Sequence, residues 1–331
     1  MKFAEICGQQ DLREHLQRAI AHGKFSHAYI ISGEKDSGKR MLAEAFAATM
    51  LCEDRHGADA CGVCRSCKQA ENHNHPDIHY LVHEKPNTIS VDEIRRDIND
   101  DIVIKPYSAS HKIYIIDEAE KMSPEAQNAL LKTIEEPPAY AVLFLLTSNA
   151  DGFLPTILSR CVTLEMKPIA REEMTHYLMK ECKIPDYQAE VWVSFSQGNL
   201  GKAIKLASSE EFNEWKSELV GMLRHIDHMD GWEITQAVEH LEEQKDKIQD
   251  YLDLMTMWFR DVLLYKAIGR EDKLTFRDEE MIIKNQAKNA SYQGIQQILK
   301  ALEDAKRRRK ANVNLSLTLS LLLMAIKENI A

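Results

Sequence analysis

Short apolar runs alternate with helical patterns through the first half of the chain. The runs are HAYIIS (27–32), IHYLV (78–82), KIYIID (112–117), AVLFLLTS (141–148) and CVTLE (161–165). Runs of this length, separated by helices, are typical of a mostly parallel sheet that is covered on both faces. The pattern therefore predicts an α/β domain.

The segments around these runs have the periodicity of amphipathic helices. Leu12, Leu16 and Ile20 share one face of a helix over 10–23, and Gly23 suits the position just past its end. Further helices are predicted near 39–51, 90–99 and 123–135, the last beginning at Ser123 with Pro124 in its first turn.

The strand signal disappears after about residue 168. Three short helical patterns follow, over 171–184, 187–197 and 199–209, and longer ones continue to the end of the chain. The last carries a leucine stripe typical of a packed helix. The sequence thus predicts three domains, an α/β domain over 1–167, a small helical domain over 168–208 and a larger helical domain over 209–331.

The net charge and the apolar runs limit how the chain can bind nucleic acid and where in the cell it is expected. The 331 residues include 42 Lys plus Arg against 52 Asp plus Glu, a net charge of −10. Because phosphate neutralisation dominates affinity for nucleic acid, any DNA contact must be local or supplied by partners. The N-terminus has no secretory h-region, and the apolar run over 313–326 is too short to span a bilayer, so we expect a cytoplasmic protein.

The stretch GEKDSGK, residues 33–39, fits a phosphate-binding loop between a strand and a helix. Gly33 and Gly38 permit the turn, Lys39 would reach the outer phosphates, and Ser37 belongs to the same loop. The next residue normally supplies a hydroxyl ligand to magnesium, but here it is Arg40, which has no acceptor and repels the metal. A loop that merely joins strand to helix is the alternative.

Four further residues are candidates for nucleotide chemistry. Asp117 and Glu118 end an apolar strand, as the carboxylates of a Walker B element do, although acidic pairs after strands are also common by chance. Asn149 follows the next strand and would orient a water or a γ-phosphate, or simply form a turn. Arg160 stands before a strand as a candidate arginine finger or as an ordinary solvated charge. No carboxylate cluster beyond the Asp117–Glu118 pair supports a nuclease or polymerase.

Four of the seven cysteines, Cys52, Cys61, Cys64 and Cys67, have a C-x8-C-x2-C-x2-C spacing. Tetrahedral zinc takes four thiolates, and such a closed site is structural. An iron–sulfur cluster and reduced loop thiols are the alternatives. The spacing predicts structural zinc in a module over 52–67.

Several motifs together carry a family resemblance: GEKDSGK, the four-cysteine module, DEAEKM, KTIEEPP, ILSRC and GNLGKAIKLA. In combination they resemble the AAA+ subunits of the bacterial DNA polymerase III clamp loader. The resemblance implies a P-loop (AAA+) α/β domain with a parallel sheet, a three-helix lid domain and an all-α collar domain used for oligomerisation.

Within this family the chain resembles the non-motor subunits more than the gamma/tau motors, because of two departures. Arg40 replaces the hydroxyl residue, and Lys202 stands where the motor's sensor 2 arginine is expected. The resemblance implies a degenerate nucleotide site with weak or absent ATP and magnesium binding, formed by Gly33, Ser37, Gly38, Lys39, Arg40, Asp117, Glu118, Asn149 and Lys202.

The resemblance also implies a role for Arg160, which would act in trans as an arginine finger in a neighbouring motor's ATP site. The implied partners are gamma/tau motor subunits and the delta subunit, with the sliding clamp and primer–template DNA reached through the assembled complex. The alternative is a catalytically active gamma/tau-like ATPase, because Asp117, Glu118 and Asn149 are all present.

Overall fold

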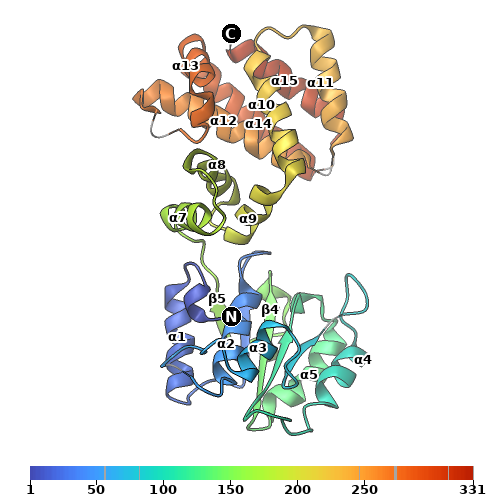
Figure 1. Cartoon of the computed structure of the whole chain (residues 1–331). Helices are drawn as coiled ribbons and strands as arrows, with labels where there is room; N and C mark the ends of the chain where they lie inside the picture. Colours follow the sequence, from blue (N-terminus) through green and yellow to red (C-terminus); the bar gives the residue numbers. More distant parts are fainter. Residues whose placement is uncertain (56, 82, 246, 272–273, 312, 331) are drawn as a thin grey trace. The chain divides into compact units, whose positions relative to one another are not determined.

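The computed structural model describes residues 1–331 except 56, 82, 246, 272–273, 312 and 331 (Figure 1). The chain forms two compact units, of which the first comprises Met1–Met174 and Gly198–Lys202, and the second Thr175–Gln197 and Ala203–Ala331. The finer predicted domain boundaries at 168 and 209 stay predictions.

The first unit is built on a five-stranded parallel sheet with the order β2-β3-β4-β1-β5. The strands are β1 (Ala28–Ser32), β2 (Ile78–Leu81), β3 (Lys112–Ile116), β4 (Ala141–Thr147) and β5 (Val162–Glu165). All five strand predictions are confirmed, although residue 82, at the end of one predicted run, lies outside the described residues. β1 pairs with β4 on one side and β5 on the other, so the loop after β1 leaves the interior of the sheet.

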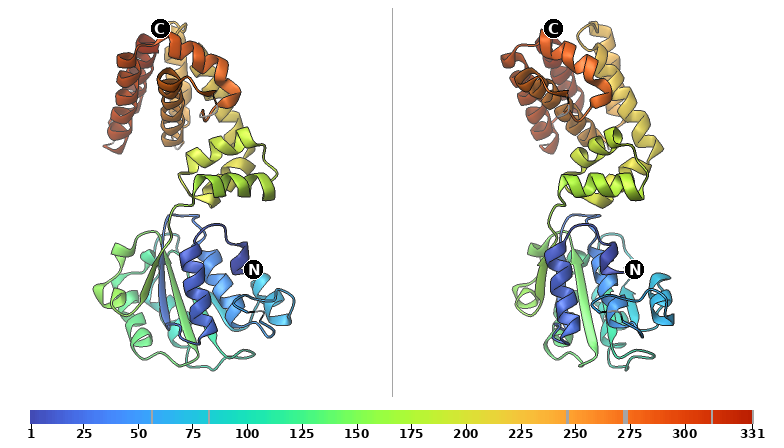
Figure 2. Two further views of the ribbon diagram at one scale, coloured as in Figure 1. Left: turned by 90° about the vertical axis from the view of Figure 1, so that its left-hand side faces the viewer. Right: turned by 60° about the vertical axis from the view of Figure 1, so that its left-hand side comes forward.

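Both faces of the sheet are buried, as the apolar runs predict. Alternate residues of one strand enter different cores: Ile31 packs on one face, whereas Ile30 packs on the other. In Figure 2 the blue helices α1 (Gln10–Ala21) and α2 (Lys39–Met50) cover one face and the green helices cover the opposite face. On the first face Tyr29 stacks on Phe144 with ring centroids 5.2 Å apart.

Helices are present at all four places where this unit was predicted to have them. Ser123 caps α5 by accepting from the Ala126 N–H at 3.2 Å, and Pro124 occupies the first turn. The segment predicted over 90–99 is an α-helix that continues as a π-helix, and the helix after the cysteine turn was not predicted. The bounds are η1 (Phe3–Glu5), α1 (Gln10–Ala21), α2 (Lys39–Met50), α3 (Arg65–Glu71), α4 (Val91–Ile94), η2 (Arg95–Asn99), η3 (Ala119–Lys121), α5 (Pro124–Glu135), η4 (Ala150–Gly152) and α6 (Pro155–Leu158).

The rest of the chain is helical, as predicted. Its elements are α7 (Arg171–Glu181), α8 (Asp186–Ser196), α9 (Leu200–Ser208), α10 (Glu210–His225), α11 (Gly231–Glu243), α12 (Ile248–Ile268), η6 (Arg277–Glu279), α13 (Glu280–Asn289), α14 (Tyr292–Lys310) and α15 (Leu315–Ile330). Leu319, Leu322, Leu323 and Ile326 of the predicted stripe are buried in α15. Among the described residues, no helix combines the length and the apolar character needed to cross a bilayer.

Candidate functional site

The phosphate-loop sequence lies between β1 and α2, as predicted. Gly38 has φ +94°, a left-handed conformation that favours glycine. A Cβ at Gly33 would lie 2.7 Å from the Cβ of Met166, so a side chain does not fit there. The two glycines are therefore required by the backbone shape of this strand–loop–helix turn.

Lys39 makes its contacts with the loop itself. Its ammonium donates to the carbonyl oxygens of Gly33 at 2.7 Å and Glu34 at 2.6 Å, and the residue is 9% exposed. Burial lowers the pKa of Lys39, and the negative charge of Asp117 opposes that change. Among the described residues the buried hydroxyl of Ser37 has no hydrogen-bond partner.

Arg40 lies along its own helix. Its Nε is 2.9 Å from Oε1 of Glu44, which is buried, and its guanidinium lies 5.0 Å from the centroid of the Tyr80 ring. Glu44 also lies 3.4 Å from Nδ1 of His73. The residue that replaces the magnesium-binding hydroxyl is thus held by a carboxylate and an aromatic ring of the same unit.

The acidic pair after β3 is present, but Glu118 is already in contact with His83 and Lys121. Its Oε2 lies 3.0 Å from Nε2 of His83 and 2.7 Å from Nζ of Lys121. The Lys121 and His83 contacts hold the pKa of Glu118 below its ordinary value. Asp117 accepts from the Glu118 N–H at 2.9 Å.

Asn149 has a local role in the structure. Its side-chain oxygen accepts from the Asp151 N–H at 3.0 Å and caps η4, which is the turn role considered for it. Whether it also orients a water stays a prediction.

The segment around Lys202 packs against the phosphate loop. The Asn199 amide donates to the Lys35 carbonyl at 2.7 Å and accepts from the Lys202 N–H at 3.0 Å. A Cβ at Gly201 would lie 2.2 Å from the Asp36 carbonyl oxygen, so no side chain fits at that position. The structure therefore brings Lys202 into the neighbourhood of the loop through Asn199, which the sequence analysis did not single out.

Arg160 lies between α6 and β5, with its side chain 40% exposed. Its Nη1 donates to the Thr156 carbonyl at 3.1 Å and to the Ser159 hydroxyl at 3.2 Å, and its Nη2 lies 3.0 Å from Oε1 of Glu135. Its guanidinium is held in place while remaining accessible.

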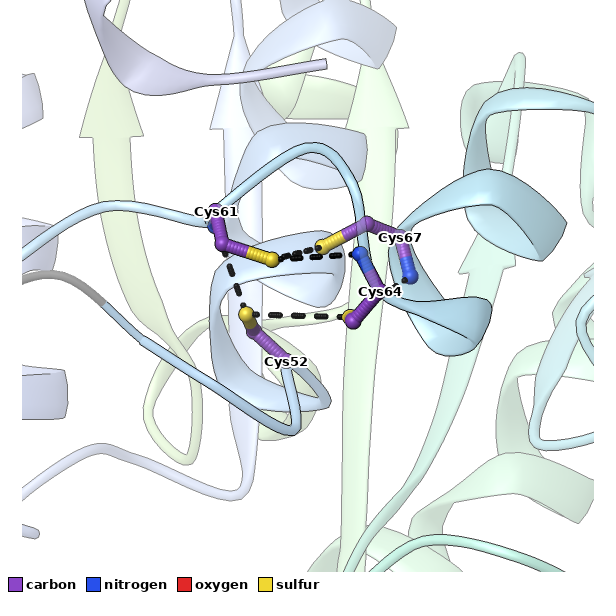
Figure 3. A group of neighbouring side chains, drawn as sticks. All are labelled: Cys52, Cys61, Cys64 and Cys67. Atoms are coloured by element: carbon purple, nitrogen blue, oxygen red, sulfur yellow. Dashed lines mark hydrogen bonds between the residues drawn. The ribbon is translucent and has the colours of Figure 1, made fainter.

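The four predicted cysteines converge on one point (Figure 3). Cys52 and Cys64 have sulfurs 4.0 Å apart, Cys61 and Cys67 have sulfurs 3.9 Å apart, and all four sulfurs lie within 4.8 Å of one another. Zinc–sulfur bonds of about 2.3 Å in a tetrahedron require sulfurs about 3.8 Å apart. The cluster therefore fits a four-thiolate metal centre.

Backbone N–H groups favour thiolates in this cluster. Cys61 Sγ accepts from the N–H groups of Val63 at 3.4 Å and Cys64 at 3.3 Å, and these bonds lower the pKa of the Cys61 thiol to about 6. Burial instead raises the pKa of Cys67 above its ordinary value. A metal ion would offset that cost, because it binds the deprotonated form.

Buried hydrogen bonds tie the cysteine module to the sheet. His75 Nδ1 accepts from the Asp77 N–H at 3.1 Å, so its Nε2 carries the proton and donates to the Ser66 hydroxyl at 3.0 Å. That hydroxyl donates to the Leu51 carbonyl at 2.8 Å. The chain of bonds joins the end of α2, the start of α3 and the entry to β2.

The module also holds the N-terminus of the chain. Asp59 accepts from the N–H groups of Phe3 and Ala4, each at 3.0 Å, and Phe3 is fully buried in the core beneath α2. Asp59 was not among the predicted site residues, and no local pattern distinguishes it from other loop acids.

Comparisons with known proteins give a consistent family. A model described as DNA polymerase III, delta subunit, matches residues 8–170, and one described as its C-terminal part matches residues 214–328. The DNA polymerase III subunit delta' of Bacillus subtilis is 30% identical over 321 residues, covering 95% of this chain and 94% of that protein.

Two further matches cover less of the relative or have lower sequence identity. Subunit tau of B. subtilis is 31% identical over 289 residues, 80% of this chain but 50% of tau. A solved gamma-subunit-related protein of Thermotoga maritima aligns with 97% of this chain and 100% of its own, with TM-score 0.47 and 21% identity. On the full-length similarity to delta', the chain belongs to the delta' subunits of DNA polymerase III, a family of clamp-loader subunits.

Proposed function

We propose that this chain is the non-motor, or stator, subunit of the bacterial replicative clamp loader. In this proposal it helps to load the sliding clamp onto primed DNA and supplies Arg160 to the ATP site of a neighbouring gamma/tau motor. The observation that carries the proposal is the state of residue 40, where an arginine paired with Glu44 stands in place of a magnesium ligand.

Three contacts argue that the chain's own loop does not turn over nucleotide. Arg40 brings a positive charge to the place where a hydroxyl would bind magnesium. Lys39 already donates two of its three ammonium N–H groups to loop carbonyls, which leaves one for a phosphate. Glu118 contacts both His83 and Lys121 through Oε2, and these contacts lower its pKa and so weaken it as a base for activating a water. Together these contacts support weak or absent nucleotide binding.

Arg160 suits the role of a finger offered to another subunit. Its guanidinium is partly exposed and is held by two oxygens of its own turn and by Glu135, so little side-chain freedom remains to be lost when it meets a phosphate. An arginine supplied in trans stabilises charge that develops on the γ-phosphoryl group and is worth about 10³–10⁵ in rate.

The partners follow from this role. The chain would contact gamma/tau motors and the delta subunit, with the helices over 209–331 as the collar that holds the ring together. The sliding clamp and primer–template DNA would be engaged by the assembled complex, which agrees with the chain's net charge of −10.

The cysteine cluster is proposed to hold structural zinc. Its four ligands complete a tetrahedron with no open position, so the metal would support the module rather than take part in chemistry. In that position zinc would secure the end of α2, α3 and, through Asp59, the N-terminal segment.

The finger is tested by Arg160→Ala in the loader reconstituted with its motor and delta subunits. We expect the DNA- and clamp-stimulated ATPase rate to fall by about 100-fold or more at sites served by this chain. Arg95→Ala is the matched control, because Arg95 is an exposed arginine of the same unit whose side chain is 63% exposed. An unchanged rate in the Arg160 variant would falsify the finger assignment.

An active gamma/tau-like ATPase remains the second candidate, because both carboxylates follow β3 and the chain is 31% identical to tau over 289 residues. The purified chain decides between the two. A magnesium-dependent ATPase rate comparable to that of a motor subunit supports the second candidate, whereas negligible turnover supports the first.

A further inference from the structure

The last residue of α5, Glu135, contacts the proposed finger. We propose that Glu135 is the positioning residue that sets the orientation of Arg160 and thereby its effect on the neighbour's ATPase rate. This inference rests on the proposed function, since it concerns how the finger is held rather than whether Arg160 acts.

The guanidinium of Arg160 is held from two directions. On one side, Nη1 donates to the Thr156 carbonyl at 3.1 Å and to the Ser159 hydroxyl at 3.2 Å, both in the turn that precedes Arg160. On the other side, Nη2 lies 3.0 Å from Oε1 of Glu135, which comes from a different helix. Two local contacts alone leave the plane of the group free to rotate about its stem. The third contact removes that freedom.

Glu135 does not serve the stability of its own helix. The C-terminus of a helix carries partial negative charge, so a carboxylate in the last turn is unfavourable there. α5 nevertheless ends in Glu135, with Glu136 as its C-terminal cap and the cap N–H bonded to the Lys132 carbonyl. An acid at this end is explained when it has a cation to hold, and Arg160 is that cation.

The contact leaves Arg160 able to bind a phosphate. A guanidinium has five N–H donors. Among the described residues Arg160 makes the three contacts given above, which leaves two donors for phosphate oxygens. The side chain is 40% exposed, so an adjacent subunit can reach it. Glu135 therefore holds the finger without occupying it.

Loss of the contact between Glu135 and Arg160 should lower the ATPase rate of the neighbouring motor without changing its affinity for ATP. A mobile finger finds the transition-state geometry less often, whereas the neighbour's own loop still binds ATP. For Glu135→Gln in the reconstituted loader we expect kcat of the stimulated ATPase to fall about two- to fivefold with KM unchanged, the range for an exposed ion pair. Glu135→Asp, which keeps the charge on a shorter stem, retains more of the rate.

Glu136→Gln is the matched control, because it removes the same charge from the neighbouring exposed position at the same helix end. We expect it to leave kcat unchanged. In the Arg160→Ala background, Glu135→Gln is expected to cause no further loss, because the residue acts through Arg160. Equal melting temperatures of Glu135→Gln and wild-type loader would exclude a folding effect.

The outcomes separate this inference from the proposed function. If Arg160→Ala slows the loader but Glu135→Gln does not, the positioning role is wrong and the finger stands. If Glu135→Gln slows the Arg160→Ala loader as much as it slows the wild type, its effect does not pass through Arg160 and the inference is also wrong. If Arg160→Ala has no effect, the finger itself is rejected.

Discussion

Helix α2 connects the phosphate loop to the cysteine cluster. The two regions differ in how many of the side chains that their predicted ligands require are present and available. The phosphate loop precedes the first residue of α2, Lys39, and the first cysteine of the cluster, Cys52, follows its last turn. At the C-terminal end four side chains of one type converge to a shape that a metal ion fits. At the N-terminal end the loop has the right backbone, but its charged side chains are bonded to the protein.

The difference shows that a sequence motif predicts a complete site only when it contains all the ligands of that site. The cysteine motif names every ligand of its site, so correct spacing implies a complete site once the chain folds. The phosphate-loop motif names only the residues that shape the loop. Whether it binds magnesium depends on residue 40 and on what pairs with Glu118, which is His83 at a distance of 35 residues along the chain.

The largest expected effect lies at the cysteine cluster. Cys67→Ser removes a buried ligand, and we expect it to abolish stoichiometric zinc and to lower the free energy of unfolding by about 4–5 kcal/mol, the range for loss of a metal site. Elemental mass spectrometry of the native protein and denaturant unfolding measure the two quantities. Cys182→Ser is the control, because this thiol lies outside the cluster. Native protein that contains iron, or no metal, would contradict the zinc proposal.

A smaller effect is expected at Asp77, a buried carboxylate that directly precedes β2. This carboxylate is 1% exposed and accepts from the N–H groups of Ser108 at 2.8 Å and Ala109 at 2.9 Å, from the Ser108 hydroxyl at 2.9 Å and from the Tyr107 N–H. Burial alone would raise the pKa of Asp77, but the hydrogen bonds outweigh it and the pKa is lowered. Asp77→Asn places an amide donor against these N–H groups and should cost about 2–3 kcal/mol.

The pH dependence of that loss has a definite sign. Because the pKa of Asp77 is lower in the folded state, its stabilisation is fully present above the unfolded value of about 3.9 and is lost as pH falls through the folded value. The stability difference between wild type and Asp77→Asn should therefore be constant above about pH 5 and shrink below about pH 4. Asp92→Asn, with a side chain that is 88% exposed, is the control. A difference that persists unchanged into acid would contradict this account.

The smallest effect is expected at the phosphate loop. Arg40→Thr restores a hydroxyl at the magnesium position, and we expect affinity for ATP to rise about tenfold in the presence of magnesium, a modest gain for one added ligand. Turnover should stay negligible, because Glu118 remains paired with His83 and Lys121. Calorimetry measures the affinity, with Arg18→Thr on α1 as control. If the wild-type protein already binds Mg-ATP as tightly as the variant, Arg40 does not weaken the phosphate loop. The contrast between this loop and the cysteine cluster would then be wrong.

Local sequence pattern was enough for the strands, the loop glycines and the four cysteines. Strand alternation and helix periodicity are set by near neighbours, so the apolar run 27–32 predicted a strand buried on both faces, and Ile30 and Ile31 lie in the two cores. The contacts that decide the chemistry are not local. Asn199 meets the Lys35 carbonyl from 164 residues away, and Asp59 holds Phe3 from 56 residues away. Neither carries a signal in its own neighbourhood.

The position of β1 in the sheet has a consequence for the order in which the protein is made. β1 is the first strand to leave the ribosome, yet its two partners are β4 and β5, the last strands of the unit. At about 5–20 residues per second, roughly ten seconds pass before either partner emerges. Until then an apolar strand and the loop behind it have no neighbours to pair with. The sheet of this unit is therefore completed from its late end, and β1 is the strand that waits longest for its partners.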